Sequence, residues 1–302
     1  MRQPWTGCGT ALVTPFTADD RLDDAALRRL VRRQIAAGIH FLVPCGTTGE
    51  NPTLSAAERR QVVEIAVQEA GGHTPVLAGA GGYDTHEVVA LAREMAAAGA
   101  NGLLSVTPYY NKPTPDGLVA HYSAVAEATD LPIVVYNVPG RTACNIDAAT
   151  LVRLAGIPRI AGVKEASGNM MQICQVCHDL RDDFIVLSGD DALTLPMMAI
   201  GAKGIISVAS NEAPRPMVEM VEATEENRFD EARRIHNRLL PLMLINFVES
   251  NPIPVKAALA EMGLITEAYR LPMVAPRPDS RAKIVAVLRD LGLLVDECRA
   301  TA

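Results

Sequence analysis

The stretch GTALVTPF, residues 9–16, followed by DDAALRRLVRRQIAAG, residues 23–38, contains the pattern that decides the fold. The first segment is a short apolar run, which is typical of a buried strand. The second has apolar residues three and four positions apart, as on one face of a helix, and Asp23 stands at its start as a potential N-cap. Together the two segments predict one βα unit.

The same pattern recurs along the chain at intervals of roughly 20 to 30 residues. Ser55, Asp147 and Asp191 stand at later helix starts as further potential N-caps. Eight βα units within about 220 residues are what a (β/α)8 TIM barrel needs, whereas a doubly wound sheet usually has fewer strands and a GxGxxG turn after the first. The other seven strand-like runs are 40–46, 74–81, 101–108, 131–139, 160–167, 184–190 and 204–210.

The strand-like runs stop after residue 222. Three helical patterns follow, at 226–247, 254–264 and 280–294. The sequence therefore predicts a catalytic (β/α)8 barrel over residues 1–222 and a C-terminal helical region over residues 223–302.

Composition excludes several classes of function. The 302 residues are 49% hydrophobic, which is enough for a large core, and the net charge of -7 comes from mixed acidic and basic residues. No basic patch suited to nucleic acid or to an anionic membrane is present. No apolar run reaches the length of about 18 residues that a membrane span requires, and the first residues lack a secretory signal. We expect a cytoplasmic protein.

The cysteines and histidines do not form a pattern that predicts a metal site. The six cysteines are scattered, and we expect them to be reduced. Cys174 and Cys177 form a CxxC pair, but the surrounding residues have helical spacing and no second ligand pair is nearby, so we expect both to pack in the core. No HxxxH pair occurs among the six histidines. We therefore predict no metal.

In a barrel of this kind the active site lies where the strands end. Reactive residues follow five of the predicted strands, in GTTGE (46–50), TPYYN (107–111), YNVPGRT (136–142), KEASG (164–168) and SGDD (188–191). These loops are therefore the candidate site.

Lys164 is the most unusual of these residues because it lies inside a strand-like run. The chain has five lysines: Lys112 and Lys203 lie in loops, and Lys256 and Lys283 lie in predicted C-terminal helices, where we expect solvated ammonium groups. An ammonium is tolerated better in the barrel mouth than against the apolar helices, so we place Lys164 in the mouth. An ion pair with Glu165 is disfavoured, because adjacent strand residues point to opposite faces.

A lysine in a low-dielectric pocket has a lowered pKa, and a neutral amine can form a Schiff base with a ketone or aldehyde. Lys164 is therefore the candidate nucleophile. Tyr136, at the end of the neighbouring strand, is the candidate proton shuttle, and Thr47 and Tyr110 could pass protons on. The backbone amides of Thr47 and Thr48 in GTTGE could bind a carboxylate or a phosphate, and the planar guanidinium of Arg141 in PGRT could bind a carboxylate.

The motifs GTTGE, SVTPYYNKPT, YNVPGRT, GVKEASG, SGDDA and SNPIPVKAAL together resemble the dihydrodipicolinate synthase family of class I, pyruvate-dependent aldolases. The resemblance runs from about residue 4 to residue 295. It implies a lyase that condenses pyruvate with L-aspartate 4-semialdehyde to give 4-hydroxy-tetrahydrodipicolinate in lysine and diaminopimelate biosynthesis, with no metal or organic cofactor. GTTGE and the strand lysine are shared more widely among pyruvate aldolases, whereas YYN with YNVPGRT is narrower.

The resemblance also implies a role for each matching residue. Lys164 forms the pyruvate imine, Tyr136 is its acid/base group, and Thr47 and Tyr110 complete a proton relay. Thr48 and the Ile206 carbonyl contact pyruvate, and Arg141 receives the carboxylate of the semialdehyde. Tyr110 is implied to reach a neighbouring subunit across a tight dimer, with two dimers commonly forming a homotetramer.

Inhibited members of the family bind L-lysine in a pocket beside the tyrosine that matches Tyr109. The resemblance places Asn51, Ala56, Arg59, Tyr83, Glu87 and Tyr109 in this possible regulatory pocket. Ala56 and Arg59 stand where histidines are common, and Tyr83 stands where a small amide is usual. We therefore expect weak inhibition or none.

Two alternatives are a sister aldolase, such as N-acetylneuraminate lyase or a keto-deoxy sugar acid aldolase, and a non-catalytic ligand-binding barrel. Arg141 and the pair Tyr109 and Tyr110 disfavour the first, because sugar acids call for loops that recognise hydroxyl groups. The presence of both Lys164 and Tyr136 disfavours the second.

Overall fold

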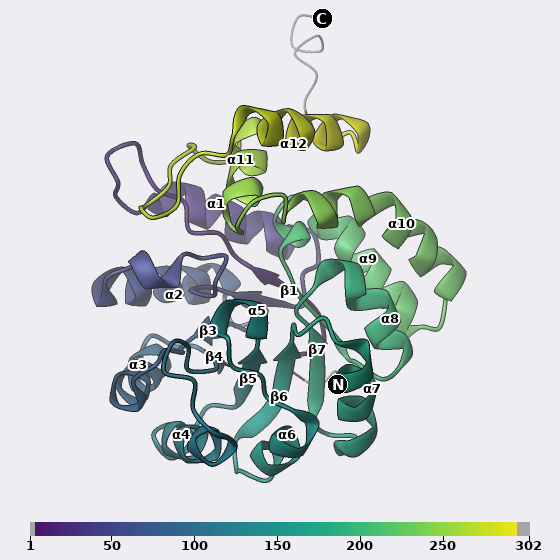
Figure 1. Cartoon of the computed structure of the whole chain (residues 1–302). Helices are drawn as coiled ribbons and strands as arrows, with labels where there is room; N and C mark the ends of the chain where they lie inside the picture. The colour runs from purple at the N-terminus through teal and green to yellow at the C-terminus, as the bar shows by residue number, and fades with distance from the viewer. Residues whose placement is uncertain (1–3, 295–302) are drawn as a thin grey trace, which may run out of the picture.

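The computed structural model describes residues 4–294 and has the predicted barrel architecture, with helices surrounding a central ring of strands (Figure 1). All eight strands are parallel and run in the order β2-β1-β8-β7-β6-β5-β4-β3, and a bridge between Leu42 and Val76 links β2 to the chain leading into β3. The strands are β1 (Gly7–Ala11), β2 (Phe41–Val43), β3 (Leu77–Gly79), β4 (Gly102–Val106), β5 (Ile133–Asn137), β6 (Ile160–Glu165), β7 (Ile185–Ser188) and β8 (Gly204–Ser207).

The helices follow the strands in alternation, and the eight predicted βα units are confirmed. Those around the barrel are α1 (Asp24–Ala36), α2 (Ala56–Ala70), α3 (Thr85–Ala97), α4 (Pro115–Glu127), α5 (Pro139–Thr142), α6 (Ala148–Ala155), α7 (Met170–Asp179), α8 (Thr194–Ala199) and α9 (Pro214–Glu225). The single-turn helix α5 was not predicted, and it begins at a proline, which is well suited to a first helical position.

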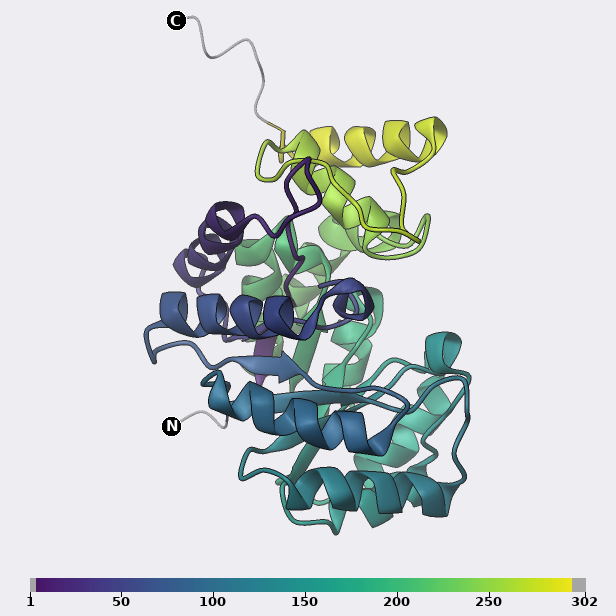
Figure 2. The ribbon, with the colours of Figure 1, turned by 90° about the vertical axis from the view of Figure 1, so that its left-hand side faces the viewer.

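Three further helices form the C-terminal region, α10 (Phe229–Ile245), α11 (Ile253–Glu261) and α12 (Pro278–Asp290). Figure 1 shows α11 and α12 at the top and α10 beside α9; α10 packs on α9, and α12 contacts both α10 and α11. In Figure 2 the yellow α12 again lies at the top. Because α9 extends to Glu225, the boundary expected after residue 222 falls within this helix, and the division into two domains remains a prediction. Among residues 4–294, none of the helices has the length and hydropathy of a membrane span.

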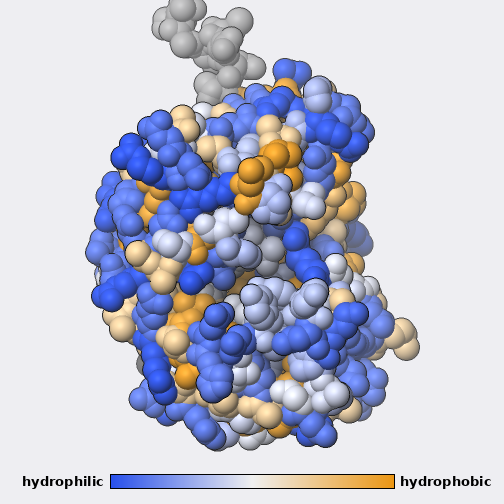
Figure 3. Space-filling view, turned by 60° about the vertical axis from the view of Figure 1, so that its left-hand side comes forward, coloured by the Kyte–Doolittle hydropathy of each residue, from blue (hydrophilic) through white to orange (hydrophobic). Residues whose placement is uncertain are grey.

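Three hydrophobic clusters of described residues form the core, and two of them lie on the two sides of the strands. One cluster fills the space between the strands and the surrounding helices, and a second fills the barrel interior, where it includes Tyr136 and Ile206. The surface carries mostly hydrophilic residues, with hydrophobic patches around a central hollow in the view of Figure 3. The strand residues near the carboxyl end of the barrel therefore stand between an apolar interior and the open loops.

Three of the four expected N-caps are confirmed. The side chains of Asp23, Ser55 and Asp147 accept hydrogen bonds from backbone amides in the first turns of α1, α2 and α6. The expectation for Asp191 is wrong, because Asp190 caps the short helix that follows and accepts from the Ala192 amide.

Asp191 is instead buried behind β8. It accepts hydrogen bonds from the Ser207 hydroxyl (2.5 Å) and from the backbone amides of Val208 (3.0 Å) and Ala209 (3.1 Å), while burial raises the pKa of its carboxyl group. Asp191 therefore fixes the turn after β8 from within the core.

The expectations for the cysteines are confirmed only in part. Cys45, Cys144, Cys174 and Cys177 are free thiols, Cys8 is buried, and Cys298 lies outside the described residues. Cys174 and Cys177 lie on α7 as predicted, but Cys174 is exposed and Cys177 is only partly buried. Core packing is therefore the wrong expectation for Cys174, because α7 buries Ile173 and Val176 instead. No cluster of metal-ligating side chains occurs within residues 4–294.

Candidate active site

Lys164 and Tyr136 face each other at the mouth of the barrel. They are directly paired in the register of β5 and β6, and Lys164 Nζ lies 4.3 Å from the centroid of the Tyr136 ring. The two residues are only 5% and 6% exposed. The predicted placement of Lys164 in the mouth is therefore confirmed.

Glycine at position 189, just after β7, leaves room for the Lys164 side chain. A Cβ atom added there would lie 3.1 Å from Lys164 Cε and 2.6 Å from Ala166 Cβ, which is too close for an ordinary contact. The glycine of the SGDD motif thus helps to shape the space around the lysine.

Glu165 points away from the barrel mouth, as alternation along the strand requires. Its carboxylate accepts from the Asn137 side-chain amide (2.9 Å) and from the Ser167 backbone amide (2.7 Å). The carboxylate is therefore engaged on the opposite face of β6 from Lys164, which agrees with the expectation against a Lys164–Glu165 ion pair.

The GTTGE loop after β2 is a compact double turn. The Gly49 amide donates to the Gly46 carbonyl and the Glu50 amide donates to the Thr47 carbonyl, both at 3.1 Å. Thr48 is buried, and its hydroxyl oxygen accepts a hydrogen bond from the Asn251 side chain (2.9 Å). The loop thus holds both threonines in a fixed conformation beside the lysine.

Arg141 lies on α5, directly after β5. Its Nη2 donates to the backbone carbonyl of Asn251 (3.2 Å), so Asn251 contacts both Arg141 and Thr48. The guanidinium is exposed and keeps further donors for a ligand.

A cavity of about 110 Å³ brings these groups together. Its lining includes both predicted threonines together with Tyr136, Arg141 and Lys164. Phe247 and Asn251 from the C-terminal region also line it, and the sequence did not assign them to the site. The only signal for Asn251 was its position within the SNPIPVKAAL motif.

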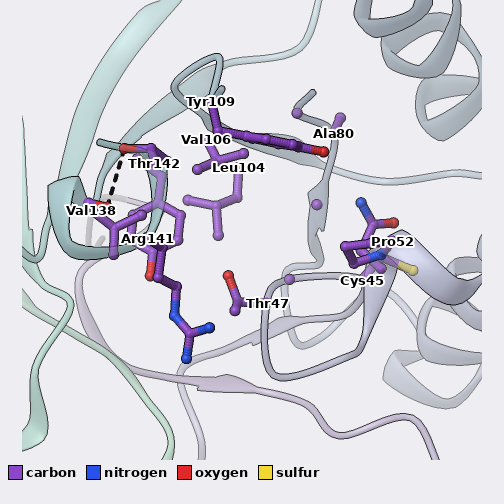
Figure 4. Close-up of a pocket in the computed structure, with 15 residues that line it drawn as sticks. Cys45, Thr47, Pro52, Ala80, Leu104, Val106, Tyr109, Val138, Arg141 and Thr142 are labelled. Atoms are coloured by element: carbon purple, nitrogen blue, oxygen red, sulfur yellow. Dashed lines mark hydrogen bonds between the residues drawn. The ribbon is translucent and has the colours of Figure 1, made fainter. Parts of the chain in front are cut away.

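A second cavity of about 200 Å³ adjoins the first and shares four lining residues with it, Thr47, Tyr136, Val138 and Arg141. In Figure 4 the Arg141 guanidinium and the Thr47 hydroxyl lie at one end of this cavity, and the apolar side chains of Leu104 and Val106 lie at the other. Together the cavities bring a buried amine, a phenol and a guanidinium close to one another, and these groups suit a small molecule that carries a carbonyl and a carboxylate.

Cys45 also lines the second cavity, but it is a poor alternative nucleophile. Burial raises the pKa of its thiol to about 12. The thiolate, which is the reactive form, is therefore scarce at neutral pH.

Two predicted residues lie apart from these cavities. Tyr110 is 92% exposed in the loop after β4 and does not line either cavity. Ile206 is buried in the barrel interior, in the same cluster as Tyr136, and its side chain lines neither cavity. The single chain thus brings Thr47, Tyr136 and Lys164 together, but not Tyr110.

A third cavity, of about 550 Å³, lies between the start of α2, the loop that leads into α3 and α3 itself, and it shares Asn51, Pro52, Gly81 and Tyr109 with the second cavity. Tyr83 and Tyr109 stack edge to face there, with ring centroids 5.2 Å apart, and burial raises the pKa of Tyr109. Glu94 also lines the cavity, although it was not predicted. All six residues of the possible regulatory pocket line this cavity: Asn51, Ala56, Arg59, Tyr83, Glu87 and Tyr109.

The expectation that Lys256 is solvated is wrong. Lys256 is 0% exposed on α11, and its ammonium forms an ion pair with Glu50 of the GTTGE loop (2.5 Å). Burial lowers the pKa of Lys256, and attraction to the Glu50 carboxylate opposes that shift. The GTTGE loop and the C-terminal region are therefore joined by a charged contact that the sequence did not reveal.

A model described as the dihydrodipicolinate synthetase family matches residues 4–291. The chain belongs to this family. A relative from Koribacter versatilis, named 4-hydroxy-tetrahydrodipicolinate synthase, is 55% identical over 95% of this chain and 96% of its own. The resemblance inferred from the motifs is thus confirmed, and it is favoured over the sister aldolases and the non-catalytic barrel.

Solved structures agree with this family assignment. Dihydrodipicolinate synthase from Thermotoga maritima superposes with a TM-score of 0.95 at 43% identity, covering 97% of this chain and 100% of its own. A dihydrodipicolinate synthase from Acinetobacter baumannii, described as complexed with pyruvate, gives 0.94 at 41% identity and covers 96% and 99%. The dihydrodipicolinate synthetase family therefore accounts for the whole barrel and for the C-terminal helices as well.

Proposed function

We propose that this chain is a lyase that condenses pyruvate with L-aspartate 4-semialdehyde to give 4-hydroxy-tetrahydrodipicolinate, a step of lysine and diaminopimelate biosynthesis. The observation that carries the proposal is the buried amine of Lys164, 4.3 Å from the Tyr136 ring centroid, in a cavity that also contains Arg141. The names of the similar proteins support this reaction over a sugar-acid aldolase. A cytoplasmic location remains a prediction.

In the first half of the reaction, the Lys164 amine attacks the ketone carbon of pyruvate. The resulting carbinolamine loses water to give an imine, and the Tyr136 hydroxyl moves the protons that this loss requires. Thr47 and Tyr110 relay protons to and from Tyr136. Thr48, through its hydroxyl and backbone amide, holds the pyruvate carboxylate, with the Ile206 carbonyl near the same substrate.

In the second half, loss of a methyl proton converts the imine into an enamine. The enamine carbon attacks the aldehyde carbon, and the amino group of the semialdehyde then adds to the imine carbon and releases the Lys164 amine. Arg141 holds the carboxylate of the semialdehyde with its planar guanidinium. The lysine imine is the electron sink, so this route uses no metal or organic cofactor.

The proposal is tested by steady-state assays with pyruvate and L-aspartate 4-semialdehyde, followed by identification of the product by mass spectrometry. We expect saturable turnover that depends on both substrates. N-Acetylneuraminate and keto-deoxy sugar acids serve as comparison substrates. Faster cleavage of either one than condensation of the semialdehyde would contradict the proposal.

We further propose that Tyr110 acts in the active site of a second copy of the chain within a tight dimer, with two dimers forming a homotetramer. Tyr110 is almost fully exposed in one chain and does not reach the cavity of its own Lys164. Tyr83, which is 53% exposed, lies in the same region, because its carbonyl accepts from Asn111, the residue after Tyr110. An exposed aromatic surface of this kind suits an interface between copies.

Mixing inactive chains tests this arrangement. A chain with Lys164→Ala and a chain with Tyr110→Phe should each be nearly inactive alone. After dissociation and reassembly together, we expect about a quarter of wild-type activity, because half of the dimers are mixed and each rebuilds one of two sites. No recovery of activity in verified mixed dimers would show that Tyr110 does not act across the interface.

Inhibition by L-lysine is expected to be weak or absent. Ala56 offers no hydrogen-bond donor, and Arg59 lines the cavity with a permanent positive charge. At about 6 Å and an effective dielectric constant of about 20, Arg59 repels a ligand ammonium by roughly 2 to 3 kcal/mol before screening by salt. Glu87 and Glu94 line the same cavity, and Arg59 opposes their attraction for the ligand.

The test is a steady-state assay with millimolar lysine, comparing wild type with Arg59→Gln. We expect little inhibition of wild type and roughly tenfold tighter inhibition of the variant. Arg60→Gln is the matched control, because Arg60 is exposed and pairs with Glu64 outside the cavity. Strong inhibition of wild type at these concentrations would contradict the prediction.

A further inference from the structure

The buried ion pair between Glu50 and Lys256 has no role in the reaction proposed above. The side chains of Glu50 and Lys256 are 2% and 0% exposed, and the Lys256 ammonium also lies 4.3 Å from the Phe16 ring centroid and 5.5 Å from that of Tyr269. Taking two charges out of water is costly, and a buried ion pair is weak evidence for added stability. The pair therefore calls for a geometric role rather than a stabilising one.

The position of Glu50 in the chain suggests such a role. It is the last residue of the GTTGE loop, two positions after Thr48, and it adopts the left-handed conformation (φ 54°, ψ 36°) that non-glycine residues rarely adopt. Surrounding contacts must hold this conformation. On its other side the loop is held by the Thr14 hydroxyl, which donates to the Gly49 carbonyl (2.7 Å).

Lys256 lies on the segment that also contacts the candidate substrate-binding side chains. Asn251 precedes α11, and it donates to the Thr48 hydroxyl and accepts from Arg141. Residues 251–256 therefore contact the GTTGE loop at two points, Thr48 and Glu50, and contact Arg141 at a third. Of these three contacts, only the one between Glu50 and Lys256 joins two charged groups.

We propose that the Glu50–Lys256 pair is a positioning device that fixes the GTTGE loop against the start of α11, so that Thr48 presents its hydroxyl and amide to the pyruvate carboxylate. Neither residue lines the cavity around Lys164, so both act through the loop. The inference rests on the proposed function, in which Thr48 binds pyruvate.

Loss of the pair should weaken pyruvate binding far more than the chemistry of the imine. Tyr136 and Lys164 lie on β5 and β6, outside the GTTGE loop, and are paired in the register of those two strands. Misplacement of a binding group by about 1 Å can cost up to roughly 100-fold. We expect the pyruvate concentration that gives half-maximal imine formation to rise by about 10- to 100-fold. The extent of trapping at saturating pyruvate should stay at the wild-type level.

The experiment measures borohydride trapping of the pyruvate imine, by intact mass, in wild type, Glu50→Gln, Lys256→Met and the double variant. Each single variant leaves one buried charge unpaired, and Tm should fall by about 6–10 °C. The double variant removes both charges, so its Tm should return close to wild type. Because neutral side chains cannot form the charged contact, its half-saturation value should stay raised.

Leu288→Ala is the matched control for general destabilisation, because Leu288 is fully buried on α12 and belongs neither to the GTTGE loop nor to the lining of the cavity around Lys164. It should lower Tm without changing half-saturation. A wild-type half-saturation value in the folded double variant, or the same rise in Leu288→Ala, would overturn the inference. Failure of wild type itself to form a pyruvate adduct would instead overturn the proposed function.

Discussion

The Lys164→Arg variant is expected to lose turnover by roughly 10⁴-fold or more, because the substitution removes the nucleophile on which every later step depends. A guanidinium stays protonated and cannot add to a ketone as a neutral amine does. Turnover with both substrates and trapping of the pyruvate adduct are the two measurements.

Lys283→Arg is the matched control for this experiment. Lys283 is exposed on α12, and the same substitution there should leave both turnover and trapping unchanged. Turnover of Lys164→Arg within a few-fold of wild type, in a protein of normal Tm, would remove Lys164 from the mechanism.

The Tyr136→Phe variant should fold normally and turn over about 10² to 10⁴ times more slowly, which is the range for loss of an acid/base group. The ring belongs to the hydrophobic cluster inside the barrel, and phenylalanine preserves that packing. What is lost is the hydroxyl that exchanges protons with the carbinolamine and the imine. The measurements are kcat and the rate of adduct formation with pyruvate.

Tyr122→Phe is the control for removal of a tyrosine hydroxyl. Tyr122 is fully buried on α4, and its hydroxyl donates to the Ser105 carbonyl (3.0 Å) away from both cavities. This control should lose about 1 kcal/mol of stability and keep its kcat. Tyr136→Phe with kcat close to wild type would exclude Tyr136 as the proton shuttle.

The barrel could be predicted from the sequence because each unit carries two local signals, an apolar run and a helical period. Parallel strands covered by helices on the outside are apolar on both faces, so their runs stand out. The same signal identified Lys164, because burying an ammonium inside an apolar run is costly unless a function uses it or another group compensates it. Strand alternation then placed Glu165 on the opposite face.

The features that the sequence did not reveal depend on contacts between distant segments. Lys256 was assigned to solvent because it lies in a C-terminal helix, yet residues 251–259 are all buried where α11 meets the barrel. The apolar neighbours of Lys256 are a local signal like the one that singled out Lys164. Its partner Glu50 lies 206 residues away, which no local pattern indicates.

Asn251 and Phe247 illustrate the same limit. They reach the cavity from the segment between α10 and α11, whereas the barrel rule directs attention only to the ends of the strands. The N-cap was assigned to Asp191 instead of Asp190, because both aspartates follow β7 and either could cap a helix. Packing decided between them, since Asp191 is drawn into the core by three hydrogen bonds.

The central claim, that Lys164 is the amine that binds pyruvate covalently, is tested most directly on the wild-type protein. The protein is incubated with pyruvate, reduced with borohydride, digested, and the modified peptide is located by mass spectrometry. We predict one pyruvate-derived adduct per chain, on Lys164. The absence of an adduct, or an adduct on Lys112, Lys203, Lys256 or Lys283 in its place, would contradict the claim.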